Sequence, residues 1–143
     1  MKRVFLIMLI LFLLLTGCIR SSSKTLEADN ITIGLSFSSY VMFGADQGIV
    51  DNLLSQFNSL SFEKTAEQID LLTAFHVSFS YKGKGVKSFW VDKKGVFWLD
   101  GTTECFKVSS GYLDYQYIKA VYEGSQNNSA RQDVQGRIRG EYL

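Results

Sequence analysis

The sequence predicts an α+β domain, in which a mainly antiparallel sheet of about five to six strands has two helices packed on one face. Three observations lead to this fold class. Several short segments alternate apolar and polar residues, which is typical of strands with one buried face. These segments follow one another across short turns, so neighbours pair as hairpins. Two other segments repeat their apolar residues at helical spacing. The domain is expected over residues 31–123.

The domain is expected to begin with a strand and a helix. Residues 31–38 alternate between apolar and polar side chains, and 40–43 extend this strand after a kink at the serines. Apolar residues recur at helical spacing up to Asn58, and Asp46 stands where a helix cap is needed. One face of this helix is therefore expected to pack on the sheet.

The middle of the chain is expected to add strands. Residues 60–64 form a short strand, and 65–72 form either a helical turn or a loop. The clean alternation of 75–81 predicts a strand. Two glycines in 82–85 predict a turn. Because a strand follows this turn, its glycines do not indicate a phosphate-binding loop.

A hairpin is predicted from two strand-like segments, 86–92 and 96–100, which flank Lys93-Lys94-Gly95. A three-residue loop that ends in glycine fits a type I turn followed by a glycine bulge. This turn places Asp92 opposite Val96. The register then decides which side chains share a face.

In this register Trp90 lies directly opposite Trp98, on the less apolar face of the hairpin, with Ser88, Asp92 and Asp100 around them. These five residues are the candidate binding surface, because exposed aromatic pairs favour contact with sugar rings, peptides or protein partners. Two alternatives stand beside it. The tryptophans can serve only to stabilise the hairpin, or they can be covered by another segment. A slip of one residue would place both in the core.

The end of the domain is expected to contain a last strand and a second helix. Residues 104–108 form the strand, and Ser109 or Ser110 caps the helix. Gly124 matches the glycine that commonly follows the end of a helix. Residues 124–143 are rich in amides and charges with few apolar anchors, so they predict a disordered tail.

The N-terminal segment has the composition of an export signal. Lys2 and Arg3 precede an unbroken apolar run from Val4 to Leu15. This run is shorter than the roughly 20 residues of a membrane span, but it has the length of a signal-peptide core. The residues that follow, Leu15-Thr16-Gly17-Cys18, resemble the lipobox of bacterial lipoproteins.

The resemblance implies a membrane anchor. Residues 1–17 would be a signal peptide cleaved between Gly17 and Cys18, and the Cys18 thiol would carry a diacylglyceryl group with fatty chains such as palmitate. Two acyl chains hold a protein stably on a membrane. With Ile19 after the cysteine, the expected location is the outer membrane of a Gram-negative host or the outward face of a Gram-positive cell membrane. An ordinary secretory signal or an uncleaved anchor is the competing interpretation.

Beyond the signal, residues 18–30 are polar and predict the lipidated cysteine with a flexible tether. From Cys18 onward the chain has 13 Lys and Arg against 14 Asp and Glu, so no basic excess indicates a nucleic-acid partner. If Cys18 is lipidated, Cys105 has no partner for an intrachain disulfide, and burial as a small apolar residue is expected.

Catalytic motifs are missing from the sequence. His76 is the only histidine, so a histidine-rich zinc site and a Glu-x-x-His motif are excluded. Alternation places His76 on the polar face of its strand, and no Gly-x-Ser-x-Gly turn presents a nucleophile. We therefore expect no catalytic residues, no metal site, no cofactor and no enzymatic activity.

Together these features predict a non-enzymatic cell-envelope lipoprotein, anchored in the membrane and facing the extracytoplasmic side. Its small domain would bind a macromolecular partner or a wall component. The order of helix, Phe-rich strands and Tyr-rich final helix is similar to that of small uncharacterised lipoproteins of Gram-positive bacteria. Two alternatives remain: a lipoprotein inhibitor of an envelope-attacking enzyme, and a small surface hydrolase that uses scattered carboxylates or Cys105.

Overall fold

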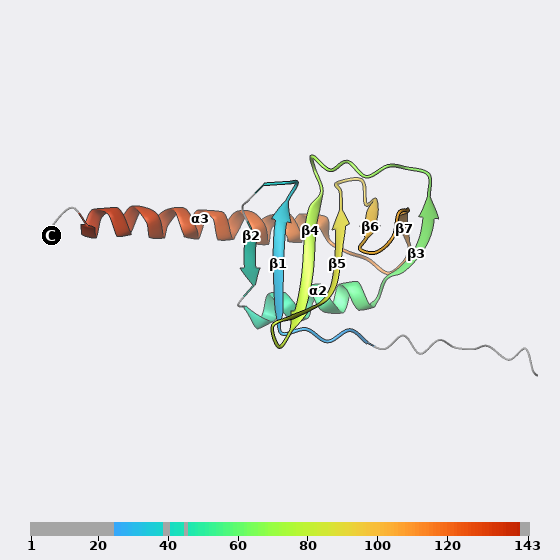
Figure 1. Cartoon of the computed structure of the whole chain (residues 1–143), viewed down its shortest axis with the longest axis horizontal. Coiled ribbons are helices and arrows are strands. Elements are labelled where there is room, and N and C mark those ends of the chain that lie inside the picture. The colour runs from blue at the N-terminus through green and yellow to red at the C-terminus, as the bar shows by residue number, and fades with distance from the viewer. Residues whose placement is uncertain (1–24, 39–40, 45, 141–143) are drawn as a thin grey trace, which may run out of the picture.

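The computed structural model of the protein describes residues 25–38, 41–44 and 46–140. The predicted export segment, with Gly17 and Cys18, lies outside the described residues. The described part contains seven strands and two helices (Figure 1): β1 (Asn30–Leu35), β2 (Val41–Gly44), α2 (Gln47–Asn58), β3 (Ser61–Thr65), β4 (Phe75–Tyr81), β5 (Lys84–Val91), β6 (Phe97–Leu99), β7 (Cys105–Ser110) and α3 (Tyr115–Gly140).

The strands form a single sheet in the order β2-β1-β4-β5-β6-β7-β3, and every neighbouring pair is antiparallel. The predicted α+β class with a mainly antiparallel sheet is therefore confirmed. The sheet has one strand more than expected, because β2 pairs with β1 instead of extending it. A turn separates the two strands: Ser36 takes a positive φ of 51°, and the amide of Ser38 donates to the carbonyl of Leu35.

Both helices cover the same face of the sheet, as predicted. The ring of Phe57 in α2 contacts Phe79 and Phe89, and the ring of Phe75 contacts Tyr122 in α3. The buried core lies between these layers and consists mostly of strand residues: Ile31, Ile33, Phe75, Val77, Phe79, Phe89, Val91 and Phe97, with Val50, Leu53, Ile118 and Tyr122 from the helices. Figure 1 views the sheet from the opposite face, with α3 passing behind the strands.

The two predicted hairpin turns form as their residues require. Between β4 and β5, Lys82 and Gly83 both have positive φ, which suits the twist of a two-residue hairpin. Between β5 and β6, the amide of Gly95 donates to the carbonyl of Asp92, and the amide of Asp92 donates to the carbonyl of Val96. The predicted register of this second hairpin, with Trp90 opposite Trp98, is confirmed.

The first helix begins where the sequence predicts. The carboxylate of Asp46 accepts a hydrogen bond of 2.8 Å from the amide of Gly48 and caps α2. The second helix begins later than expected. Because β7 continues to Ser110, neither Ser109 nor Ser110 caps α3; the carboxylate of Asp114 does, accepting from the amides of Gln116 and Tyr117 at 2.9 and 3.0 Å.

Helix α3 does not end at Gly124. It continues to Gly140, and Figure 1 shows its second half projecting beyond the sheet. The expected end at Gly124 is wrong, and residues 125–140 are helical where the sequence predicts a disordered tail. The physical reason is local: the chain contains no proline, and nothing after Gly124 interrupts the helical hydrogen bonds.

The segment before β1 is docked on the domain, whereas the sequence predicts a tether as far as Asn30. The side-chain amide of Asn58, at the end of α2, both donates to the carbonyl and accepts from the amide of Leu26, each at 3.1 Å. Leu26 and Ala28 pack against the core. The ordered domain therefore begins before Ile31.

Segment 66–74, which connects β3 to β4, is a loop with turns rather than a helix. It runs along the edge of the sheet where β4 begins (Figure 1). Within the described part of the chain, neither helix is long and apolar enough to cross a membrane.

Candidate binding surface

The face of the sheet opposite the helices carries a row of side chains that crosses four strands. The register places His76 of β4 beside Trp90 of β5, Trp90 beside Trp98 of β6, and Trp98 beside Cys105 of β7. On β1 the neighbour of His76 is Gly34, which has no side chain. Large rings therefore lie next to one another on the face that the helices leave uncovered.

Trp90 is the centre of this row. The ring of His76 stacks on it at 4.7 Å between centroids, and the ring of Phe37 contacts it at 5.8 Å. Phe37 comes from the turn after β1 and is 76% exposed. We call Phe37, His76, Trp90 and Trp98 the aromatic surface.

Trp98 is exposed and yet held in place. Its side chain is 37% exposed, and its indole Nε1 donates a hydrogen bond of 2.8 Å to the carbonyl of Thr102. The hydroxyl of Thr102 in turn donates to the carbonyl of Leu99 at 2.7 Å. A large apolar side chain that is already ordered loses little conformational entropy when a partner covers it.

A row of hydroxyl groups lies beside the aromatic surface. Thr32, Ser78 and Ser88 are neighbours on β1, β4 and β5, on the same face as the rings. Ser88 donates a hydrogen bond to the exposed carboxylate of Asp100. Of the candidates from the sequence, the structure thus brings Ser88 and Asp100 to the uncovered face together with both tryptophans.

Asp92 is not part of this surface, and that prediction was wrong. Its side chain is completely buried. One carboxylate oxygen accepts from the amides of Lys94 and Val96 at 2.9 and 3.0 Å, and the other accepts from the amide of Asp70 at 2.9 Å. Asp92 ends its strand, so its side chain folds back over the turn and binds backbone amides. It ties the β5–β6 turn to the loop before β4.

His76 and Cys105 also differ in part from expectation. His76 lies on the polar face as predicted, but Trp90 covers its ring, so it is half-buried. Cys105 is a free thiol and is half-buried rather than buried. Its place beside Trp98, at the margin of the aromatic surface, explains why the core does not enclose it.

Sequence reasoning missed two members of the aromatic surface. The position of His76 follows from the alternation in 75–81, once β4 is paired with β5 in the observed register. Phe37 had no such signal. It reaches Trp90 only because the positive φ of Ser36 turns the chain after β1. A positive φ is uncommon for a serine, so the sequence does not predict it.

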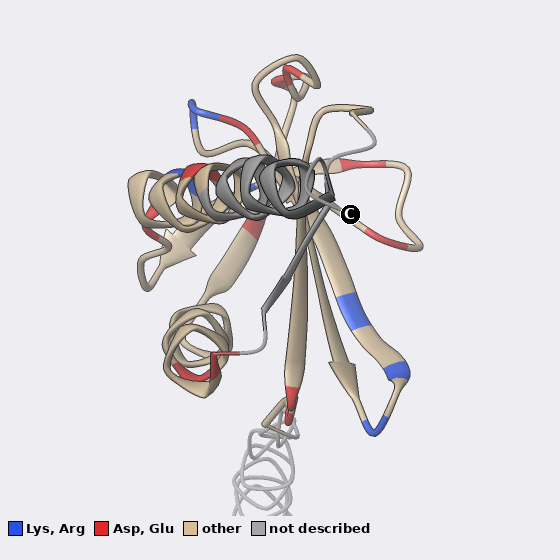
Figure 2. Ribbon diagram, turned by 90° about the vertical axis from the view of Figure 1, so that its left-hand side faces the viewer, with Lys and Arg blue, Asp and Glu red and all other residues tan. Residues whose placement is uncertain are grey.

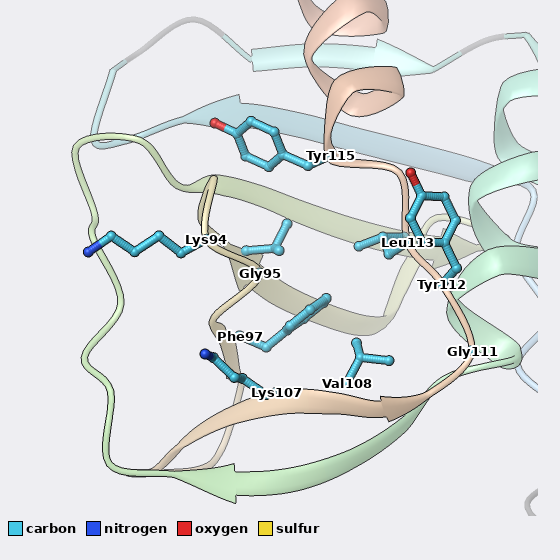
Figure 3. A pocket seen from close by; sticks show the side chains of 10 residues that line it. Lys94, Gly95, Phe97, Lys107, Val108, Gly111, Tyr112, Leu113 and Tyr115 are labelled. Atoms are coloured by element: carbon cyan, nitrogen blue, oxygen red, sulfur yellow. The ribbon is translucent and has the colours of Figure 1, made fainter.

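On the helix side of the sheet, a hollow of about 270 Å³ lies between the β5–β6 turn and the start of α3 (Figure 3). Phe97, Val108 and Leu113 converge on it, whereas the side chain of Lys94 extends away. The ammonium group of Lys107 is paired with Glu67. The ten lining residues include no carboxylate, imidazole, serine or cysteine. The hollow therefore suits an apolar group.

Tyr115 forms the wall of this hollow nearest the loop before β4. Its hydroxyl donates a hydrogen bond of 2.6 Å to the carbonyl of Thr73. Burial raises the pKa of this phenol above its ordinary value of 10.0, and the negative charges of Asp92 and Asp70 raise it further. The phenol is therefore a neutral hydrogen-bond donor at physiological pH.

The described residues contain no group of three or more His, Cys, Asp and Glu side chains that could hold a metal ion. Comparisons with protein families, with curated proteins and with solved structures found no match for this chain. The described residues thus form an α+β domain in which both helices, α2 and α3, pack on the same face of an antiparallel sheet.

Proposed function

We propose that this protein is a non-enzymatic lipoprotein of the cell envelope, whose domain binds a macromolecular partner or a wall component through the aromatic surface. The lipobox-like residues Leu15 to Cys18 support the anchor. The observation that carries the binding role is the contiguous contact of Phe37, Trp90 and His76 on the sheet face that α2 and α3 leave uncovered. The domain would face the extracytoplasmic side.

Physical chemistry favours a partner at this surface. Covering apolar area contributes about 25 cal/mol per Å², and Phe37 and Trp98 leave much of their area in water. Tryptophan is also among the residues that most often dominate binding energy at interfaces. The hydroxyl row and Asp100 beside the rings supply polar groups for the rim. A row of rings beside a row of hydroxyls fits a sugar chain or a protein surface.

A hydrolase is the less favoured alternative, because the polar groups are connected in the wrong order. In a serine hydrolase, a histidine lies between the serine and the carboxylate and takes the proton of the serine. Here Ser88 bonds directly to Asp100, while His76 stacks on Trp90. Binding rather than hydrolysis is what this arrangement supports.

The anchor is tested by Cys18→Ser in the producing cell. We expect the variant to leave the membrane fraction or to accumulate with its signal peptide uncleaved, and to lose incorporation of labelled fatty acid. Incorporation that continues in Cys18→Ser would refute the lipobox.

The surface is tested by chemical cross-linking in intact cells, comparing Trp98→Ala with Tyr112→Ala. Tyr112 is the matched control, because it is 67% exposed but lines the hollow on the helix side. We expect Trp98→Ala to lose the cross-linked species that the native protein and Tyr112→Ala retain. If Trp98→Ala retains every species, the aromatic surface is not where the partner binds.

A further inference from the structure

The tip of the β4–β5 hairpin concentrates positive charge. It carries Lys82, Lys84 and Lys87, and no acidic residue occurs between Phe75 and Val91. Lys82 and Lys84 are exposed, and Lys87 is half-exposed. Among the described residues, the lysines in salt bridges are Lys64, Lys107 and Lys119. The ammonium groups of the three hairpin lysines therefore have no carboxylate within 4 Å in this part of the chain.

This charge contrasts with the rest of the chain. From Cys18 onward, and without these three lysines, the protein has ten basic and fourteen acidic residues. Figure 2 shows the basic residues of the hairpin at the lower end of the sheet, on the side away from α2. The hairpin tip is therefore a local cluster of positive charge in a protein whose net charge is close to zero.

Apolar side chains accompany the lysines. Tyr81 and Val86 are among the exposed large apolar residues, at 36% and 39%. The ammonium of Lys82 lies 5.0 Å from the centroid of the Tyr81 ring. Tyrosine and lysine both combine an apolar body with a polar tip, so both are suited to the boundary between lipid headgroups and water.

The chain enters the domain at this same end. Segment 25–29 crosses the lower edge of the sheet (Figure 1) and reaches the hairpin: the amide of Asp29 donates to the carbonyl of Ser80 at 3.0 Å. The carboxylate of Asp29 accepts from the amide of Lys82 at 2.8 Å. Only Ile19 to Lys24 separate Cys18 from the docked segment. That length of chain spans at most about 25 Å.

We propose that the tip of the β4–β5 hairpin contacts the anionic headgroups of the membrane that holds Cys18. The inference rests on the proposed lipid anchor, which keeps this end of the domain near the bilayer. Lysines attract anionic lipids within a Debye length of the surface. Asp29 lies beside the hairpin, where its carboxylate accepts from the Lys82 amide. This contact would orient the strands roughly perpendicular to the membrane plane. The aromatic surface would then remain accessible to a partner.

The test uses the lipidated protein, reconstituted in vesicles of phosphatidylcholine alone or mixed with phosphatidylglycerol. Lysines are acylated with a water-soluble reagent, and mass spectrometry gives the rate at each position. Lys93 and Lys94 are the internal control, because they are exposed at the opposite end of β5. We expect anionic vesicles to slow acylation of Lys82, Lys84 and Lys87 about threefold or more, and high salt to remove the effect.

A matched pair of variants isolates the charge. In anionic vesicles, Lys82→Gln with Lys84→Gln should restore the acylation of Lys87, whereas Lys93→Gln with Lys94→Gln should not. Equal acylation of the hairpin lysines in both kinds of vesicle would overturn the proposal. Slow acylation of the hairpin lysines in phosphatidylcholine alone, equal to that in anionic vesicles, would overturn it too, because it would indicate a contact with protein instead of anionic lipid. Failure of the anchor itself is distinguishable, because the protein would then not float with either vesicle.

Discussion

Gly111 occupies a position where a side chain would collide with the backbone of a neighbouring segment. It lies between β7 and α3 with a φ of +86°, and a Cβ atom there would lie 2.4 Å from the carbonyl oxygen of Ser59. We expect Gly111→Ala to lower the free energy of unfolding by about 2–4 kcal/mol, from backbone strain and the clash together. Urea unfolding measures the loss.

Gly101→Ala is the matched control for that substitution. Gly101 has a similar φ of +81°, but nothing lies within 4 Å of its Cβ position. It should therefore lose only the cost of a left-handed backbone, about 1–2 kcal/mol. Equal losses in the two variants would show that the close approach of Gly111 to the end of α2 has no energetic weight.

Tyr115 should make the stability of the fold depend on pH. Because burial and two nearby carboxylates raise the pKa of its phenol in the folded state, the unfolded chain loses this proton first as the pH rises. Unfolding then releases a proton, so the free energy of unfolding falls as the pH rises above 10.0. Tyr115→Phe should flatten this fall between about pH 9 and 11, as followed by urea unfolding. The same slope in both proteins would contradict the assigned cause.

At the scale of residues, short-range rules predicted what depends on neighbours in the chain. The Asp46 cap and the Asp92–Val96 turn were predictable because each forms within four residues. The burial of Asp92 was not, because one of its three amide donors comes from Asp70, in a loop whose position depends on the whole sheet.

At the scale of elements, a substitution of Gly124 shows whether helix α3 continues through this residue. As an interior helical residue with open space around its Cβ position, Gly124 should tolerate alanine well. We expect Gly124→Ala to raise the free energy of unfolding by about 0.5–1 kcal/mol, because alanine has the higher helix propensity. Urea unfolding decides the sign. A loss of stability would mean that Gly124 ends the helix in a left-handed conformation.

Elements were predictable where a periodic pattern was strong, and less so at their ends. The alternation in 75–81 matches β4 residue for residue. The cap of α3 was misplaced because β7 continues through the serines that look like caps in the sequence. The docking of Leu26 was missed because its partner, Asn58, lies 32 residues away and no local pattern joins them.

At the scale of the molecule, the two faces of the sheet differ in what covers them. One face packs against both helices and stabilises the fold, and the other presents the aromatic surface. The sequence predicted this division on the β5–β6 hairpin, where the turn fixes the register. It did not predict the strand order, because the pairs β1–β4 and β3–β7 join segments that other elements separate in the chain.

The sequence accordingly predicts only part of the aromatic surface. Trp90 and Trp98 share a hairpin, so their proximity follows from local rules. His76 and Phe37 join them through the pairing of β4 with β5 and through the turn after β1. A surface that spans several strands depends on how the sheet assembles, so the sequence alone does not predict its full extent.

We propose that the partner lies against the aromatic surface, and site-specific photo-cross-linking in intact cells would show whether it does. A photoreactive phenylalanine analogue replaces Phe37, Trp98 or, as control, Tyr112, and circular dichroism confirms that each variant folds. We expect the same adduct from positions 37 and 98 and none from position 112, because position 112 lies on the helix side. An adduct from position 112 with none from positions 37 and 98 would show that the partner binds elsewhere.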